Sequence, residues 1–352
     1  MQTTIQKPKN LRDSNMELLR ITAMILVLVV HASFLSLGTP KSSDFQMAPT
    51  STFFRLFSES VSIICVNVFV LISGWYGIKA KLSRMLAFLF QVYFLNVIVY
   101  YGMKAFGGGN TGALGLIEWL FMPIEHYWFV KAYILLYILT PALNAFVDKA
   151  NKKQVEQFLI AFFCVQTIIG FWWGIEFSAG YSALSFIGLY VLARYMYIHP
   201  IKFTQLNKYI YLAMYFVATM ITTVVALLMV IKDGNVGWFY YYNSPLVIFA
   251  SVCILLFFSN ISIHSKIVNW VAISCFAAYV IHCSQPFFHT AYLTPIKKWY
   301  DTEPVIIFLL YTILLIAIVF IASILLDKIR ISVWKFLSSL YIFASKKLCL
   351  SK

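Results

Sequence analysis

Apolar runs long enough to cross a lipid bilayer recur along almost the whole of this 352-residue chain. A bilayer core about 30 Å thick needs about 20 consecutive apolar residues in a helix. Composition agrees with a membrane location, because 61% of the residues are hydrophobic and only 11% are charged, against about 25% charged in soluble domains. The sequence therefore predicts an all-α, polytopic bundle of about ten transmembrane helices, at residues 16–36, 58–78, 84–103, 127–147, 155–174, 181–198, 209–231, 244–260, 268–290 and 304–326.

The positive charges are distributed unevenly between the loops of such a bundle. Most of the 27 Lys and Arg residues fall on one side when the N-terminus is placed inside, as the positive-inside rule requires of cytoplasmic loops. We therefore predict cytoplasmic termini, with an N-terminal tail at 1–15, a transmembrane domain at 16–326 and a basic tail at 327–352. Orientation and contact with anionic lipid explain most of the net charge of +14, so nucleic acid is not expected as a partner.

The six cysteines lack the spacing of a metal site or a disulfide framework. The chain has no CxxC pair and no zinc-like spacing of cysteine with histidine. We expect no metal and no disulfides.

Two glycine-containing segments have structural interpretations. GGGNTGALG at 107–115 predicts a loop, and the short apolar stretch at 116–122 predicts an interfacial or re-entrant segment. Ser73-Gly74 lacks the second glycine of a G-x-S-x-G nucleophile motif. We interpret it as a small-residue pair that lets two helices pack closely.

Arg20 and His31 stand out in the first apolar run. Their separation of eleven residues is close to three helical turns, so the two side chains share one face about 16 Å apart. The ordinary interpretation of Arg20 is a topology anchor paired with Glu17, and that of His31 is a neutral imidazole bonded to another helix. An ionisable group at membrane depth is also a functional hypothesis, and imidazole is the usual general base near neutral pH.

Four segments resemble, in order, the motifs of membrane acyltransferase family 3, whose members O-acylate cell-surface glycans and related acceptors. The first is the arginine and histidine of RITAMILVLVVH (20–31). The others are a "F-h-h-S-G-h" helix, a "H-h-W-F-h" segment and a late "Y-h-h-H" helix, found as NVFVLISGWYGIK (67–79), HYWFVKAYILLYILTPAL (126–143) and FAAYVIHCSQPF (276–287). The resemblance spans nearly the whole chain, and ten helices is the usual membrane core of the family.

The resemblance implies catalytic roles for His31 and Arg20. It also implies that cytoplasmic acetyl-CoA is the acyl donor and that cations at the inner mouth bind it. Family members carry R-x-x-R at the start of the third helix, where this chain has Lys81-Leu-Ser-Arg84. Lysine lacks the bidentate fork of arginine, so Arg84 is the better candidate. Arg20, Lys81 and Arg84 are therefore the expected donor-binding residues.

Several further residues are candidates for the acceptor side or for support of the site. His282 lies at membrane depth in the late motif, and its ordinary interpretation is a contact between helices. Glu125, His126 and Trp128 lie at the outer end of the fourth span, where an aromatic interface belt would also explain Trp128. His31 would act either as a general base on a sugar hydroxyl or as a carrier that becomes an acyl-imidazole.

The expected function is O-acetylation of a hydroxyl on a cell-surface, capsular or exopolysaccharide sugar, in a bacterial inner membrane. The alternative is a transporter or flippase for a lipid-linked saccharide, which is also a basic multi-helix bundle. Such a protein would be expected to carry more charges at membrane depth, or broken helices paired at midplane. Sequence leaves the oligomeric state open.

Overall fold

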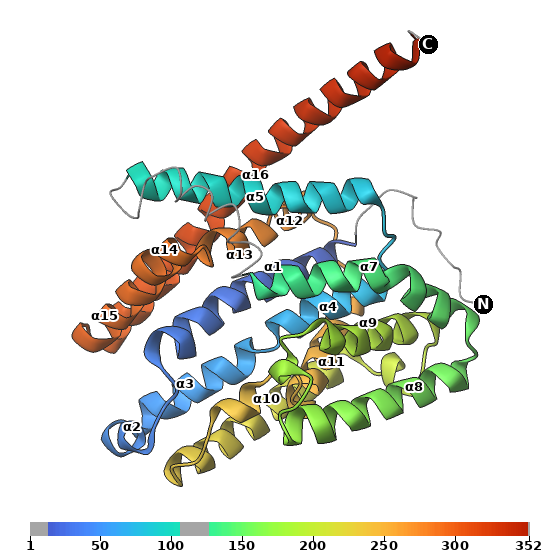
Figure 1. Cartoon of the computed structure of the whole chain (residues 1–352). Helices are drawn as coiled ribbons and strands as arrows, with labels where there is room; N and C mark the ends of the chain where they lie inside the picture. Colours follow the sequence, from blue (N-terminus) through green and yellow to red (C-terminus); the bar gives the residue numbers. More distant parts are fainter. Residues whose placement is uncertain (1–12, 106–126, 351–352) are drawn as a thin grey trace.

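The computed structural model describes residues 13–105 and 127–350, and within these ranges it consists of helices without a β-strand. The long helices run roughly side by side in one bundle, except that the C-terminal part of α16 projects out of it (Figure 1). They are α1 (Ser14–Val30), α3 (Pro49–Ser62), α4 (Cys65–Tyr76), α5 (Leu82–Ala105), α7 (Trp128–Lys149), α8 (Lys152–Val165), α9 (Ala183–Ile198), α10 (Lys208–Ile231), α11 (Pro245–Ser259) and α16 (Val305–Leu350). The shorter helices are α2 (Ser42–Met47), α12 (Lys266–Ala272), α13 (Phe276–His282), α14 (Gln285–Phe287) and α15 (Thr294–Thr302).

Eight helical stretches of the described residues are long and apolar enough to cross a membrane. They are Ser14–Leu35, Pro49–Tyr76, Leu82–Ala105, Trp128–Lys149, Lys152–Trp172, Lys208–Ile231, Gly237–Ser259 and Val305–Leu340. The described residues therefore contain eight candidate spans, whereas the sequence predicted about ten. The expected span at 181–198 corresponds to α9, which has only 16 residues.

The expected span at 268–290 is not one continuous helix. It is divided into α12, α13, α14 and a π-helical turn at Phe288–Leu293. Ser284 has an extended backbone conformation just after α13, which interrupts the helix close to His282. The sequence remains apolar through these breaks, so hydropathy alone did not reveal them.

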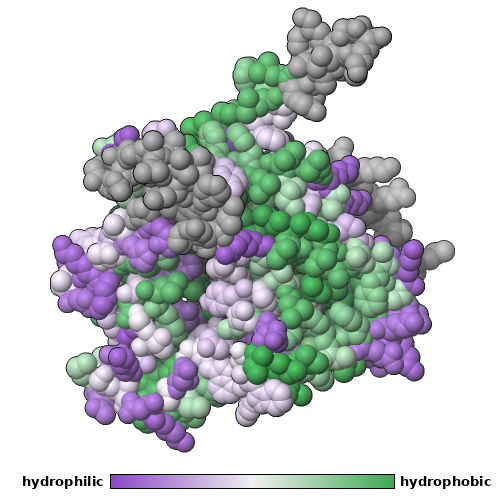
Figure 2. All heavy atoms as spheres, viewed as in Figure 1, coloured by the Kyte–Doolittle hydropathy of each residue, from purple (hydrophilic) through white to green (hydrophobic). Residues whose placement is uncertain are grey.

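The surface has the distribution expected of a protein surrounded by lipid. Figure 2 shows hydrophobic side chains over the middle of one face and hydrophilic ones gathered toward its ends. Helix α16 is the most exposed span, because only 11% of its most apolar window is buried. It continues without a break past residue 326, so the expected start of the C-terminal tail lies inside this helix.

Close packing at the Ser73-Gly74 pair is confirmed. A Cβ atom added to Gly74 would lie 2.3 Å from the backbone oxygen of Tyr190 in α9. The absence of a side chain therefore lets α4 and α9 approach each other. The predicted loop at 107–115 and the predicted re-entrant segment at 116–122 lie outside the described residues.

Candidate functional site: a histidine pair beside an aromatic cavity

His31 lies where the first helix changes its winding. Helix α1 ends at Val30, and a π-helical turn runs from His31 to Leu35. Single π-helical turns inside α-helices are frequent at functional sites. The hydroxyl of Ser36 donates to the carbonyl oxygen of His31 over 2.9 Å, which holds this turn at its exit.

His282 is the direct partner of His31. It is the last residue of α13 and is fully buried, and its Nε2 lies 2.7 Å from Nδ1 of His31. The centroids of the two rings are 4.9 Å apart. The sequence had placed both residues at membrane depth, and the structure brings them together from helices 251 residues apart in the chain.

The hydrogen bonds of the pair assign a role to each ring nitrogen. Nδ1 of His282 lies 2.5 Å from the carbonyl oxygen of Ala278, and a carbonyl only accepts, so this Nδ1 carries the proton. When both rings are neutral, Nε2 of His282 must then accept the proton that Nδ1 of His31 donates. No residue in the described part of the chain hydrogen-bonds Nε2 of His31, which leaves this atom a free lone pair and makes it the basic and nucleophilic nitrogen of the pair.

Cys283 completes a cluster of possible metal ligands. Its Sγ lies 3.4 Å from Nε2 of His282 and 3.8 Å from Nδ1 of His31. Two nitrogens bound tetrahedrally to one zinc ion at about 2.0–2.1 Å would lie more than about 3 Å apart. The observed 2.7 Å between the imidazoles is instead a hydrogen-bond distance, so we interpret the cluster as a proton-sharing pair.

The ring of His31 faces a cavity of about 280 Å³ inside the bundle. The cavity follows one side of α1 and its π-helical turn from Met24 to Leu35. Aromatic side chains form much of its wall, among them Trp128, Tyr181, Tyr240 and Tyr242. The rings of Trp128 and Tyr242 are stacked, with centroids 5.8 Å apart.

Buried tyrosines hold the helices that carry the two histidines. The hydroxyl of Tyr292 donates to the carbonyl oxygen of Leu28 in α1 over 2.7 Å, and its ring packs against His282. The hydroxyl of Tyr127 donates to the carbonyl oxygen of Val280 in α13 over 2.8 Å. Hydrogen bonds to the backbone therefore hold both α1 and α13, the helices that place His31 and His282.

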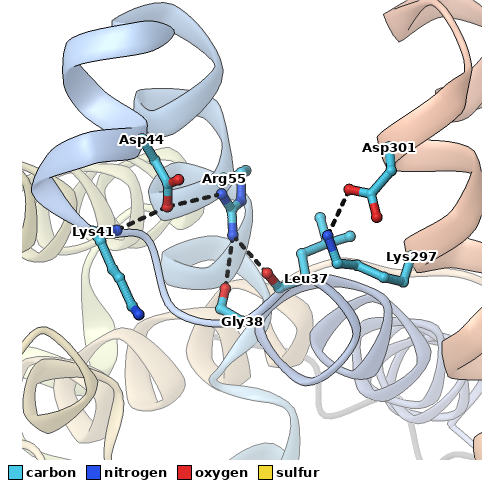
Figure 3. Close-up of polar contacts among 7 residues, drawn as sticks. All are labelled: Leu37, Gly38, Lys41, Asp44, Arg55, Lys297 and Asp301. Atoms are coloured by element: carbon cyan, nitrogen blue, oxygen red, sulfur yellow. Dashed lines mark hydrogen bonds and ion pairs between the residues drawn. The ribbon is translucent and has the colours of Figure 1, made fainter.

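Arg55 of α3 fixes the chain where it leaves the His31 turn (Figure 3). Its guanidinium donates to the carbonyl oxygens of Leu37 and Gly38 over 3.3 and 2.7 Å. It also forms an ion pair with Asp44 at 3.7 Å. Both carbonyl bonds come from Nη2, and Nη1 makes the ion pair, so the guanidinium ties α3 to the end of the first span.

The predicted donor-binding cations lie at the opposite end of α1. Arg20 forms an ion pair with Glu17, which is the pairing that its interpretation as an anchor predicts. Lys81 and Arg84 are exposed at the start of α5. The hydroxyl of Tyr76, at the end of α4, donates to Asp13 just before α1 over 3.0 Å, so both helix ends belong to the same end of the bundle. Met24, one turn after Arg20, already lines the cavity.

The remaining acceptor candidates divide into two groups. Trp128 lies in the cavity wall, whereas Glu125 and His126 lie outside the described residues.

Sequence reasoning missed Glu59, which also lines the cavity and is 2% exposed. The expected second span began at residue 58 and left Glu59 at its edge, but α3 begins at Pro49 and places Glu59 well inside. The sequence signal that could have identified Glu59 was an acidic residue within an apolar segment.

These features define a polytopic membrane protein with a candidate active site enclosed by its helices. The family described as an acyltransferase domain matches residues 13–327, and the chain belongs to this family, acyltransferase family 3. The protein is therefore a membrane acyltransferase. Comparisons with curated proteins and with solved structures found no match.

Proposed function

We propose that this protein transfers an acetyl group from cytoplasmic acetyl-CoA to a hydroxyl of a cell-surface, capsular or exopolysaccharide sugar. The observation that carries the proposal is the placement of His31: its ring lines the aromatic cavity and its Nδ1 is engaged by His282, which leaves Nε2 available as a base. Membership of the acyltransferase family supplies the reaction class.

In the proposed reaction Nε2 of His31 acts as the general base. It takes the proton from the acceptor hydroxyl as the hydroxyl oxygen attacks the thioester carbonyl carbon. The C–S bond of the thioester then breaks, and the leaving thiolate receives the proton from His31, so that the products are the O-acetyl sugar and free CoA. A positioned general base contributes about 10²–10⁴-fold to such a reaction. The apolar walls exclude water that would hydrolyse the thioester.

The donor is proposed to enter from the end that carries Arg20, Lys81 and Arg84. This end is cytoplasmic in the topology that the positive-inside rule favours. The phosphates of CoA would bind to the guanidinium and ammonium groups there, and the pantetheine arm would follow α1 from Arg20 toward His31. The acceptor would approach from the opposite end, and the bacterial inner membrane is the proposed location.

The test is acetyl transfer by membranes that contain the protein, using labelled acetyl-CoA and candidate glycans. His31→Ala should lower the rate of transfer by about 10²–10⁴-fold, since it removes the base. His264→Ala is the matched control, because His264 is exposed on a loop between α11 and α12. Transfer that persists undiminished in His31→Ala would remove His31 from the reaction.

A rapid acid quench during turnover separates the two routes through His31. The proposed direct transfer leaves no label on the protein. Acid-labile acetyl label that is trapped on the wild type and is absent from His31→Ala would replace the general base by an acyl-imidazole intermediate.

A further inference from the structure

Glu59 is a buried carboxyl group that the acyl-transfer chemistry described above does not use. It is 2% exposed and lines the same cavity as His31. Its Oε2 atom has no hydrogen-bond partner among the residues that the structure describes. A buried polar atom without a partner is unfavourable, so a carboxyl oxygen beside a cavity is a binding group for a ligand that brings a donor.

The neighbouring polar residues of α3 differ from Glu59 in this respect. The hydroxyl of Ser60 donates to the carbonyl oxygen of Leu56 over 2.9 Å, and that of Ser62 donates to the carbonyl oxygen of Ser58 over 2.7 Å. Both bonds lie within the helix and are typical of serine in apolar surroundings. Glu59 alone among these three also lines the cavity.

The aromatic walls suit the face of a sugar ring. The hydroxyl of Tyr240 donates to the carbonyl oxygen of Leu56 over 3.1 Å, so this group is already engaged with α3. Trp128 and Tyr242 present stacked rings in the same cavity. Aromatic faces are apolar and electron-rich, and they complement the C–H face of a pyranose while a carboxylate binds its hydroxyl edge.

The size and charge of the cavity restrict this ligand further. A volume of about 280 Å³ lies just below the usual range of about 300–1,000 Å³ for ligand sites, which suits one sugar ring. No lysine or arginine of the described residues lines the cavity, so the charge of a uronic acid would be buried there without a cationic partner, which is unfavourable. The subsite therefore favours a neutral sugar over a uronic acid.

We propose that Glu59 is a specificity-determining residue of the acceptor subsite and binds one hydroxyl of a neutral sugar ring while another hydroxyl of that ring faces His31. The proposal rests on the proposed acetyl transfer to a sugar and adds the class of acceptor. Glu59 binds the acceptor and has no part in binding acetyl-CoA. Its removal consequently changes the KM for the acceptor and leaves the KM for acetyl-CoA unchanged.

The experiment measures transfer from labelled acetyl-CoA to the methyl glycosides of glucose, galactose, mannose and N-acetylglucosamine, with methyl glucuronide as the acidic probe. The wild type should acetylate at least one neutral glycoside in preference to the glucuronide. Glu59→Gln should raise the KM for that glycoside about tenfold, the effect of weakening one hydrogen bond in a buried site. Ser62→Ala is the matched control on the same helix and should leave both KM values unchanged.

Three results would overturn the proposal: preference for the glucuronide, transfer to none of the neutral glycosides, or an unchanged acceptor KM in Glu59→Gln. If Glu59→Gln does not reach the membrane, Glu59→Asp replaces it, and the shorter carboxylate should raise the same KM. His31→Ala is assayed in parallel to separate this proposal from the proposed function. Full activity of His31→Ala contradicts the function itself, whereas loss of activity in His31→Ala with an unchanged acceptor KM in Glu59→Gln contradicts only the role of Glu59.

Discussion

The two ends of the first span are organised in different ways. At the His31 end, contacts join residues distant in sequence: His31 to His282, Tyr292 to Leu28, and Arg55 to the Leu37 and Gly38 carbonyls. At the Arg20 end, the cations have local contacts. Arg20 pairs with Glu17 three residues away, and Arg84 donates to the carbonyl oxygen of Lys79 over 3.4 Å.

This difference suits a reaction at the His31 end and binding of the acyl donor at the Arg20 end. A reaction centre needs its base held in one orientation, and buried hydrogen bonds to the backbone provide that at the His31 end. A phosphate-bearing donor is attracted by charge, which acts at longer range and tolerates flexible side chains. We therefore expect substitutions at the His31 end to lower kcat and substitutions at the Arg20 end to raise the KM for the donor.

The largest effect beyond loss of His31 itself is expected from His282→Leu. Without its partner His31 loses the hydrogen bond that fixes its tautomer and orientation, and kcat should fall about 10²-fold with little change in either KM. His282→Gln should recover part of the loss, because the amide can still accept from Nδ1 of His31.

Cys283→Ser is the matched control for the histidine pair. It changes the third member of the cluster, whose sulfur lies 3.4 Å from His282, and it leaves the bond between the imidazoles intact. Activity should remain close to that of the wild type. A loss as large as that of His282→Leu would show that the thiol, not the tautomer, governs the rate.

At the opposite end, Arg84→Ala should raise the KM for acetyl-CoA about tenfold and leave the acceptor KM unchanged, because one charge-assisted bond to phosphate is lost. The effect should shrink at high salt, which screens exposed charges. Lys153→Ala removes an exposed cation at the start of α8 and is the control. Equal increases in both KM values would argue against a donor role for Arg84.

A smaller effect is expected from Gly74→Ala, which tests how far the Arg20 end depends on helix packing. The new Cβ would lie 2.3 Å from the Tyr190 backbone oxygen, and overpacking of this kind destabilises by about 1–3 kcal/mol. Thermal unfolding in detergent measures the change. Gly102→Ala in α5 is the control, since a Cβ there meets nothing within 4 Å. Equal stability of the two variants would contradict close α4–α9 contact.

No effect at all is expected from removal of metal ions. The imidazole nitrogens of His31 and His282 share a hydrogen bond at 2.7 Å, so transfer should be unchanged after incubation with EDTA or 1,10-phenanthroline. If a chelator abolished transfer and added zinc restored it, the histidine pair would be a metal centre. The assignment of protons to its nitrogens would then be wrong.

Hydropathy predicted the helical class and the positions of most spans. It did so because burial in lipid demands long apolar runs regardless of tertiary contacts. The division of 268–290 into short helices was not predictable in this way, since Ser284 interrupts the helix without interrupting the apolar sequence.

The partner of His31 and the role of Glu59 depended on tertiary structure. Spacing along one helix relates Arg20 to His31, but no periodicity relates residues 251 positions apart. Glu59 was missed because the start of its helix was placed at residue 58, nine residues after Pro49, where α3 actually begins. Helix ends are the least reliable part of a prediction from hydropathy, and here one misplaced end concealed a buried carboxyl group.

The proposed mechanism requires that Nε2 of His31 is unprotonated, and ¹⁵N solid-state NMR of histidine-labelled protein in lipid measures this protonation state. His31→Gln and His282→Gln assign the signals of each ring by their loss. We expect protonated Nδ1 atoms in both rings and an unprotonated Nε2 in His31. A protonated Nε2 in His31 at the pH of maximal transfer would contradict the mechanism.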